Sequence, residues 1–243
     1  TQFTHIAGAA PESYNLFVEY HNDSGTRQLV YATTNNIERI DLADAFSTVA
    51  PQALTFASIC QGFVHPKDDR LYIGYDNKIA MANGNTWTTT ALTLPANYRV
   101  TSLAAYGDYL AIACCPSVSG TDYASNSVVF LWGRDTSLTV VSEVIDWGGG
   151  VLKVLGNLEG SLIGISDTNG TSNIVDFDSI QIKAYNGGTP SLIKEIVTQK
   201  QTTSTPNASI NPRVRFFHRG RLYFSVDIVG GSTSPTYYGL WSI

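Results

Sequence analysis

The feature that most constrains this chain is a loose internal repeat of apolar segments along its 243 residues. In each repeat a turn or a polar pair comes directly before an apolar run. These segments are Arg27–Tyr31, Asp69–Ile73, Gly107–Ala111, Gly160–Gly164 and Gly220–Phe224. The third residue of each segment is taken as its apolar anchor, and successive anchors lie 42, 38, 53 and 60 residues apart. The first two steps fit a four-stranded unit of about 40–50 residues, and the longer two require loop insertions.

Further strands are predicted around each anchor. A shorter apolar strand precedes it, at Asn15–Tyr20, Leu54–Ile59, Val100–Tyr106, Val151–Leu155 and Val214–Phe217. A third strand follows, at Ile37–Ile40, Lys78–Met81, Ser127–Trp132, Ser179–Lys183 and Tyr238–Trp241. Four of the five units have a fourth strand, at Phe46–Ala50, Trp87–Leu92, Leu138–Ile145 and Leu192–Val197. Asn83-Gly84 and Asn186-Gly187-Gly188 favour tight hairpins between third and fourth strands, because positive φ costs Asn and Gly little.

Four antiparallel strands per repeat predict an all-β chain with the β-propeller fold and about five visible blades. We expect a single domain over residues 1–243, with blades at roughly 8–50, 51–95, 96–145, 146–200 and 210–243. Residues 1–7 could supply a closing strand to the incomplete last blade. Alternatively, the chain is cut from a larger ring of six or seven blades. A β-sandwich or prism would explain the strand density but not the four-strand period.

Composition excludes several classes of protein. Charged residues make up 14% of the chain, against roughly 25% in ordinary soluble domains. Polarity comes instead from Thr, which favours strands, and from Ser and Asn, which favour turns. The net charge of −5 argues against nucleic-acid binding. The longest apolar run, Tyr109–Cys115, is far shorter than the ~20 residues of a membrane-spanning helix, so no membrane insertion is expected.

The three cysteines, Cys60, Cys114 and Cys115, have no metal-ligand spacing and are expected to be buried thiols. The sequence also lacks a nucleophile elbow, a Walker loop and a dinucleotide-binding loop. We therefore assign no catalytic residues and no cofactor, which favours a non-enzymatic role without settling it.

One basic patch stands out near the C-terminal end. Arginines alternate there with aromatic residues, and the patch comprises Arg213, Arg215, Phe217, Arg219 and Arg221. Strand alternation would place Arg213, Arg215 and Phe217 on one face. Arginine beside aromatic residues suits recognition of carboxylates, phosphates or proteins. We interpret the patch as a partner interface, and the alternative is a strand pair with one solvated face.

A second group of residues is acidic. Asp176 and Asp178 are two residues apart, and Asp167 lies nearby in a segment rich in Asn. Carboxylate and amide oxygens can bind Ca²⁺, which makes these three residues weak candidates for a metal site. The spacing matches no EF-hand, so solvated loop acids are the alternative interpretation.

The turn Asn83-Gly84-Asn85-Thr86-Trp87 resembles the end of the Asp-box hairpin of sialidase-like propellers. Ala80 and Ala82 stand where that motif has Ser and Asp. The resemblance supports the fold class. It implies no catalytic residue, since the box stabilises a hairpin.

The segments Asp69–Tyr75, Asn83–Trp87, Tyr106–Ala113 and Asp146–Gly150 together resemble irregular β-propellers of bacteriophage virions, such as tail, nozzle or fibre-attachment components. This resemblance implies a structural protein of the virion that contacts other protein subunits or a host surface glycan. Outside a virion, the expected location is extracellular. The alternative is a carbohydrate-binding or carbohydrate-active propeller of the sialidase-like kind, which would use exposed aromatic residues and the Asp176/Asp178 pair.

Overall fold

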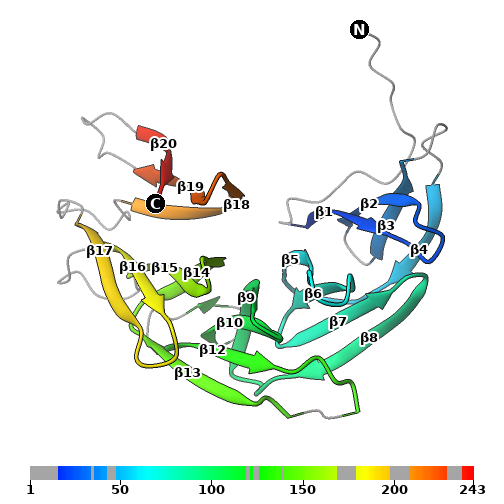
Figure 1. The fold of residues 1–243 in the computed structure, drawn as a ribbon, viewed down its shortest axis with the longest axis horizontal. Coiled ribbons are helices and arrows are strands. Elements are labelled where there is room, and N and C mark those ends of the chain that lie inside the picture. The colour runs from blue at the N-terminus through cyan, green and yellow to red at the C-terminus, as the bar shows by residue number, and fades with distance from the viewer. Residues whose placement is uncertain are drawn as a thin grey trace, which may run out of the picture. The chain divides into compact units, whose positions relative to one another are not determined.

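Every regular element in the described part of the chain is a β-strand (Figure 1). The computed structural model describes residues 16–33, 36–42, 48–118, 121–122, 126–137, 140–168, 179–197, 208–228 and 237–243. The chain divides into two compact units, Thr1–Pro95 and Ala96–Ile243. This boundary coincides with the predicted junction between the second and third repeats. That all repeats belong to one propeller domain stays a prediction, as does a closing strand from residues 1–7, which lie outside the described residues.

The first unit contains two antiparallel sheets whose strands follow one another in sequence order. The first sheet comprises β1 (Phe17–His21), β2 (Arg27–Ala32), β3 (Asn36–Asp41) and β4 (Thr48–Ala53). The second comprises β5 (Ile59–Val64), β6 (Leu71–Tyr75), β7 (Lys78–Asn83) and β8 (Thr86–Thr93). Each sheet is therefore a four-stranded meander, as the repeat predicts.

Three more sheets make up the second unit. The third sheet comprises β9 (Tyr98–Tyr106), β10 (Tyr109–Val118), β12 (Ser127–Trp132) and β13 (Glu143–Gly148), with the short β11 (Thr121–Asp122) beside β10. The fourth comprises β14 (Val151–Leu158), β15 (Ser161–Asp167), β16 (Ser179–Tyr185) and β17 (Ser191–Val197). The fifth has three described strands, β18 (Ala208–His218), β19 (Arg221–Ile228) and β20 (Tyr237–Ser242).

Two predicted strands begin later than expected. The strand predicted at Leu54–Ile59 begins only at Ile59, because the Asp76 carboxylate accepts hydrogen bonds from the backbone N–H groups of Ala57 and Ser58. These two N–H groups are thus bonded to a side chain and not to the backbone of a neighbouring strand. The strand predicted at Leu138–Ile145 begins at Glu143. Apolar residues alone suggested both early starts.

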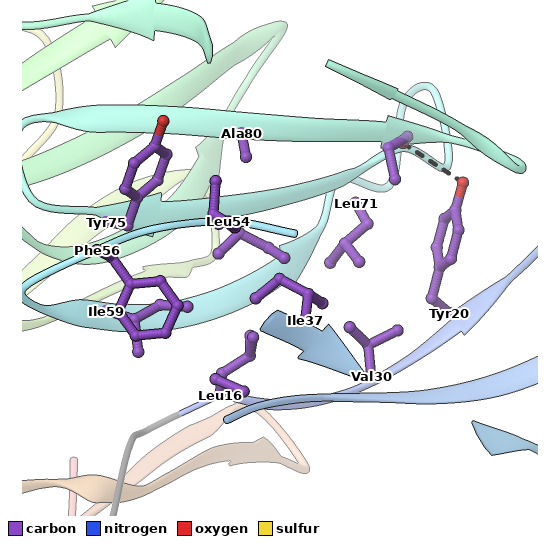
Figure 2. Packing of buried hydrophobic residues seen from close by; sticks show 13 residues of the cluster. Leu16, Tyr20, Val30, Ile37, Leu54, Phe56, Ile59, Leu71, Tyr75 and Ala80 are labelled. Carbon is purple, nitrogen blue, oxygen red and sulfur yellow. Dashed lines mark hydrogen bonds between the residues drawn. The ribbon is translucent and has the colours of Figure 1, made fainter. Parts of the chain in front are cut away.

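The core of the first unit lies between its two sheets, as Figure 2 shows. Val30 and Ile37 of the first sheet pack with Leu71 and Ile73 of the second. The sheets approach closely at Gly62, where an added Cβ would lie 2.6 Å from Val18 Cγ1. An apolar face on each sheet therefore drives the pair together.

In the second unit the fourth sheet is apolar on both faces. Leu152 and Leu162 pack with Trp147 and other residues of the third sheet. Ile163, Ile165 and their neighbours pack with Leu222 and Phe224 of the fifth sheet. Strands with two buried faces have continuous apolar sequences, which explains why apolar and polar residues do not alternate clearly along β15.

Candidate functional site

The predicted basic patch lies on the first two strands of the fifth sheet. Arg213, Arg215 and Phe217 belong to β18, and the pairing of Phe217 with Leu222 fixes the register near the turn. The ladder shifts register between Asn211 and Arg215. A common face for Arg213, Arg215 and Phe217 assumed an uninterrupted strand. It stays a prediction, because the side chains of residues 208–218 lie outside the description.

Arg219 and Arg221 are both exposed at the turn between β18 and β19. Arg219 and Gly220 have φ values of +49° and +71°. Two successive residues with positive φ are typical of a type I′ hairpin turn, in which arginine is less favourable than Asn or Asp. The turn between β14 and β15 has the same conformation but carries an exposed Glu159 before Gly160. Equivalent turns on neighbouring sheets thus carry opposite charges.

The acidic candidates are only partly described. Asp176 and Asp178 lie outside the described residues. Asp167 is not a solvated loop acid, because it ends β15 with only 3% of its surface exposed. Its Oδ2 accepts a hydrogen bond from Lys153 Nζ at 3.0 Å. Within the described ranges, no group of three or more His, Cys, Asp or Glu side chains is placed to hold a metal ion.

Polar side chains join the third and fourth sheets. The backbone N–H of Leu155 donates to Ser102 Oγ at 2.8 Å, and Asn157 Nδ2 donates to the Ala105 carbonyl at 3.0 Å. Thr101 Oγ1 donates to the Leu152 carbonyl. These bonds connect β9 to β14 along their length. Sequence reasoning missed them, because each joins residues about fifty positions apart.

Lys183 and Tyr185 on β16 extend this connection to β13. Lys183 Nζ donates to the Trp147 carbonyl at 2.9 Å, and burial lowers the Lys183 pKa although the Asp146 carboxylate opposes that shift. The Tyr185 hydroxyl donates to Glu143 Oε1 at 2.8 Å. Burial, followed by this hydrogen bond, raises the pKa of Tyr185 to about 12. Glu143 thus accepts a hydrogen bond from the neighbouring sheet.

The hairpin that resembles the Asp-box is held by the first sheet. The Gly84 N–H donates to the hydroxyl of Tyr20, and that hydroxyl also lies 3.4 Å from the Ala82 carbonyl oxygen (Figure 2). The Asn85 N–H donates to Asp23 Oδ2 at 2.8 Å. In this hairpin Ala82 stands where the Asp-box motif has its Asp. A carboxylate from the neighbouring sheet therefore binds the hairpin backbone. Asp23 is 62 residues from Asn85, so no local motif could reveal it.

Large apolar side chains are exposed on β17, which is the last strand of its sheet. Leu192 and Ile193 are 53% and 54% exposed. Lys183 pairs with Leu192 and Ile182 with Lys194, so Ile193 is an extra residue in a β-bulge. Such a bulge at a sheet edge discourages further strands from pairing there. Any partner at this edge would therefore contact the two exposed side chains and would not pair with the backbone of β17.

Two tryptophans and the three cysteines lie in the core. Trp132 and Trp147 are almost completely buried, which leaves neither as an exposed sugar platform. The three cysteines are buried, as predicted. The described residues include no helix with the length and hydropathy needed to cross a membrane.

No protein-family model matches the chain, and no curated protein matches it in sequence. Solved structures do resemble it. BBS1N, determined in complex with ARL6DN, has a TM-score of 0.53 and 13% identity over 89% of this chain and 64% of its own. A candidate 6-phosphogluconolactonase from Bacteroides uniformis has a TM-score of 0.51 and 13% identity over 96% of this chain and 73% of its own.

This chain spans less than two thirds of the BBS1N chain, and at such identity the likeness shows the fold alone. A further similar structure is the Dos1 propeller, with a TM-score of 0.46 and 13% identity over 87% of this chain and 56% of its own. The repeated four-stranded meanders agree with the likeness to BBS1N and to the Bacteroides uniformis protein. The chain has a β-propeller fold, which confirms the predicted fold class.

Proposed function

We propose that this protein is a non-enzymatic β-propeller that binds protein subunits of a larger assembly. The observation that carries the proposal is the basic turn between β18 and β19, where Arg219 and Arg221 are both exposed on either side of Gly220. Each guanidinium can bind a carboxylate through two parallel hydrogen bonds. Acidic side chains of a neighbouring subunit are the partners that fit this turn.

The arrangement of the other polar groups supports the same proposal. Asp167 is engaged by Lys153, Asp76 by backbone N–H groups, and Glu143 by Tyr185. These side chains hold turns and sheets in place within each unit. A rigid support with variable loops is the usual arrangement for recognition.

In its finer form the proposal places this assembly in a bacteriophage virion, on the resemblance of the segments Asp69–Tyr75, Asn83–Trp87, Tyr106–Ala113 and Asp146–Gly150. A tail or tail-associated component would meet both neighbouring subunits and the host surface. Host glycans are then further partners, and the exposed loops would contact them.

The first experiment measures the mass of the native chain by intact mass spectrometry and the size of its particle by light scattering. The proposal expects the chain to reside in a particle far larger than 26.3 kDa. A free monomer of that mass would overturn it, and binding on a glycan array would then favour the carbohydrate-binding alternative.

A second experiment tests the basic turn itself. The double variant Arg219→Ala/Arg221→Ala, expressed in the native source, should reduce the fraction of chain that sediments with the large particle by about tenfold, which corresponds to about 1.4 kcal/mol. Glu159→Ala at the equivalent turn of the fourth sheet is the matched control and should leave assembly unchanged. All these side chains are exposed, so thermal stability should change little. Equal sedimentation of the double variant and the wild type would remove the turn from the proposal.

A further inference from the structure

Two described hairpins of this protein contain an Asn-Gly pair, and their surroundings differ. Asn83-Gly84 lies between β7 and β8, and Asn186-Gly187 lies between β16 and β17. An Asn-Gly pair can rearrange without an enzyme, because glycine has no Cβ to hinder attack on the asparagine side chain. Whether this happens in a folded chain depends on how freely the glycine nitrogen can reach the asparagine Cγ.

Asn186 and Gly187 are exposed and lie beyond the last paired residues of their ladder, Ala184 and Ser191. A Cβ added at Gly187 or Gly188 would meet nothing within 4 Å. Among the described residues, none accepts a hydrogen bond from the Gly187 N–H. The nitrogen and its surroundings are therefore open to water and able to move.

The first hairpin is constrained at the same atoms. Asn83 pairs with Thr86 in the β7–β8 ladder. The Gly84 N–H donates to the hydroxyl of Tyr20, and Gly84 itself is buried. The next N–H, from Asn85, is bound by Asp23 Oδ2 at 2.8 Å. The glycine nitrogen can attack only after these contacts open.

We propose that Asn186 is a site of spontaneous deamidation and that the first sheet protects Asn83 from the same reaction. The Gly187 nitrogen bonds to Asn186 Cγ, the Cγ–Nδ2 bond breaks, and ammonia leaves with the proton that the Gly187 nitrogen loses. Water then opens the cyclic imide at either carbonyl, which gives aspartate or isoaspartate. The only co-reactant is water. The product adds one carboxylate to the exposed β16–β17 hairpin.

The test incubates the folded full chain in neutral to mildly alkaline buffer and maps its peptides by mass spectrometry. Conversion at Asn186 should be at least about tenfold faster than at Asn83, since opening the protected hairpin requires local unfolding. In denaturant the two sites should convert at similar rates. Asn169-Gly170, which lies outside the described residues, is resolved as a separate peptide.

Two variants make the test sharper. Tyr20→Phe keeps the ring in the core but removes the oxygen that accepts the Gly84 N–H, so conversion at Asn83 should rise while Asn186 stays unchanged. Asn186→Gln keeps an amide but lengthens the side chain, and should abolish conversion in the peptide that contains residue 186. Equal rates at Asn83 and Asn186 in the folded wild type, or an Asn186 that stays intact while the denatured chain converts, would overturn the proposal.

Discussion

Two of the interfaces between neighbouring sheets, called joints below and taken one from each unit, use different contacts to reach the same close packing. Between the first and second sheets the interface is apolar, and polar contacts lie at one end, where Tyr20 and Asp23 bind the hairpin after β7. Between the third and fourth sheets, polar side chains bind the partner backbone along the whole length of β9 and β14. Apolar burial brings both pairs together.

Hydrophobic contacts have little directionality, whereas a hydrogen bond fixes two groups to within a few tenths of an ångström. The third and fourth sheets are therefore fixed relative to each other at several positions. The first and second sheets are fixed at one hairpin, and elsewhere their alignment depends on shape. The same fold can thus contain one joint that tolerates small shifts and another that does not.

The largest expected effect tests this difference in tolerance. A Cβ at Gly164 would lie 2.4 Å from Trp147 Cζ2 and 2.6 Å from Cε2, so Gly164→Ala forces a rigid ring to move. We expect a loss of about 3 kcal/mol in the free energy of unfolding, measured by urea denaturation. Gly62→Ala is the matched change in the first unit. An added Cβ there would lie 2.6 Å from Val18 Cγ1, 2.7 Å from Leu16 Cδ1 and 3.2 Å from Val18 Cβ. These aliphatic side chains are smaller than a tryptophan ring, so the change should cost about 1 kcal/mol. The comparison fails if Gly62→Ala is the more damaging variant.

A smaller effect separates the polar contacts of the two joints. Ser102→Ala leaves the buried N–H of Leu155 without its acceptor, which should cost about 2 kcal/mol. Asp23→Ala removes the acceptor of the Asn85 N–H, but that N–H is exposed and water replaces the carboxylate, so we expect about 0.5 kcal/mol. Thermal unfolding of both variants checks the ratio. Equal losses would mean that burial does not distinguish the two joints.

A third effect appears only at alkaline pH. The Tyr185 pKa is raised from 10.0 to about 12 in the folded chain, so the unfolded chain loses this proton first. The contribution of Tyr185 to stability is then complete below pH 10 and is lost as pH rises from 10 to about 12. Tyr185→Phe should flatten the decline in unfolding free energy over this window. A variant that declines as steeply as the wild type would exclude Tyr185 as a source of that dependence.

Much of the fold could be predicted from the sequence, because a four-strand period requires only local information. Leu71, Leu162 and Leu222 mark buried strands, and Asn83-Gly84 marks a turn, whatever the rest of the chain does. One error fell where a side chain from the turn between β6 and β7 competes with strand pairing. Asp76 binds the backbone at Ala57 and Ser58, and the apolar residues around them gave no sign of it.

The sequence by itself determined the all-β class, the repeat and its turns, since hydrophobic periodicity and turn chemistry act between neighbours in the chain. Only the tertiary structure decided that Asp167 is a buried partner of Lys153, that Asp23 and Tyr20 hold a hairpin some sixty residues away, and that Asn186 and Asn83 differ in protection. Those properties depend on burial and on contacts between separate sheets, and these arise only when the chain brings distant residues together.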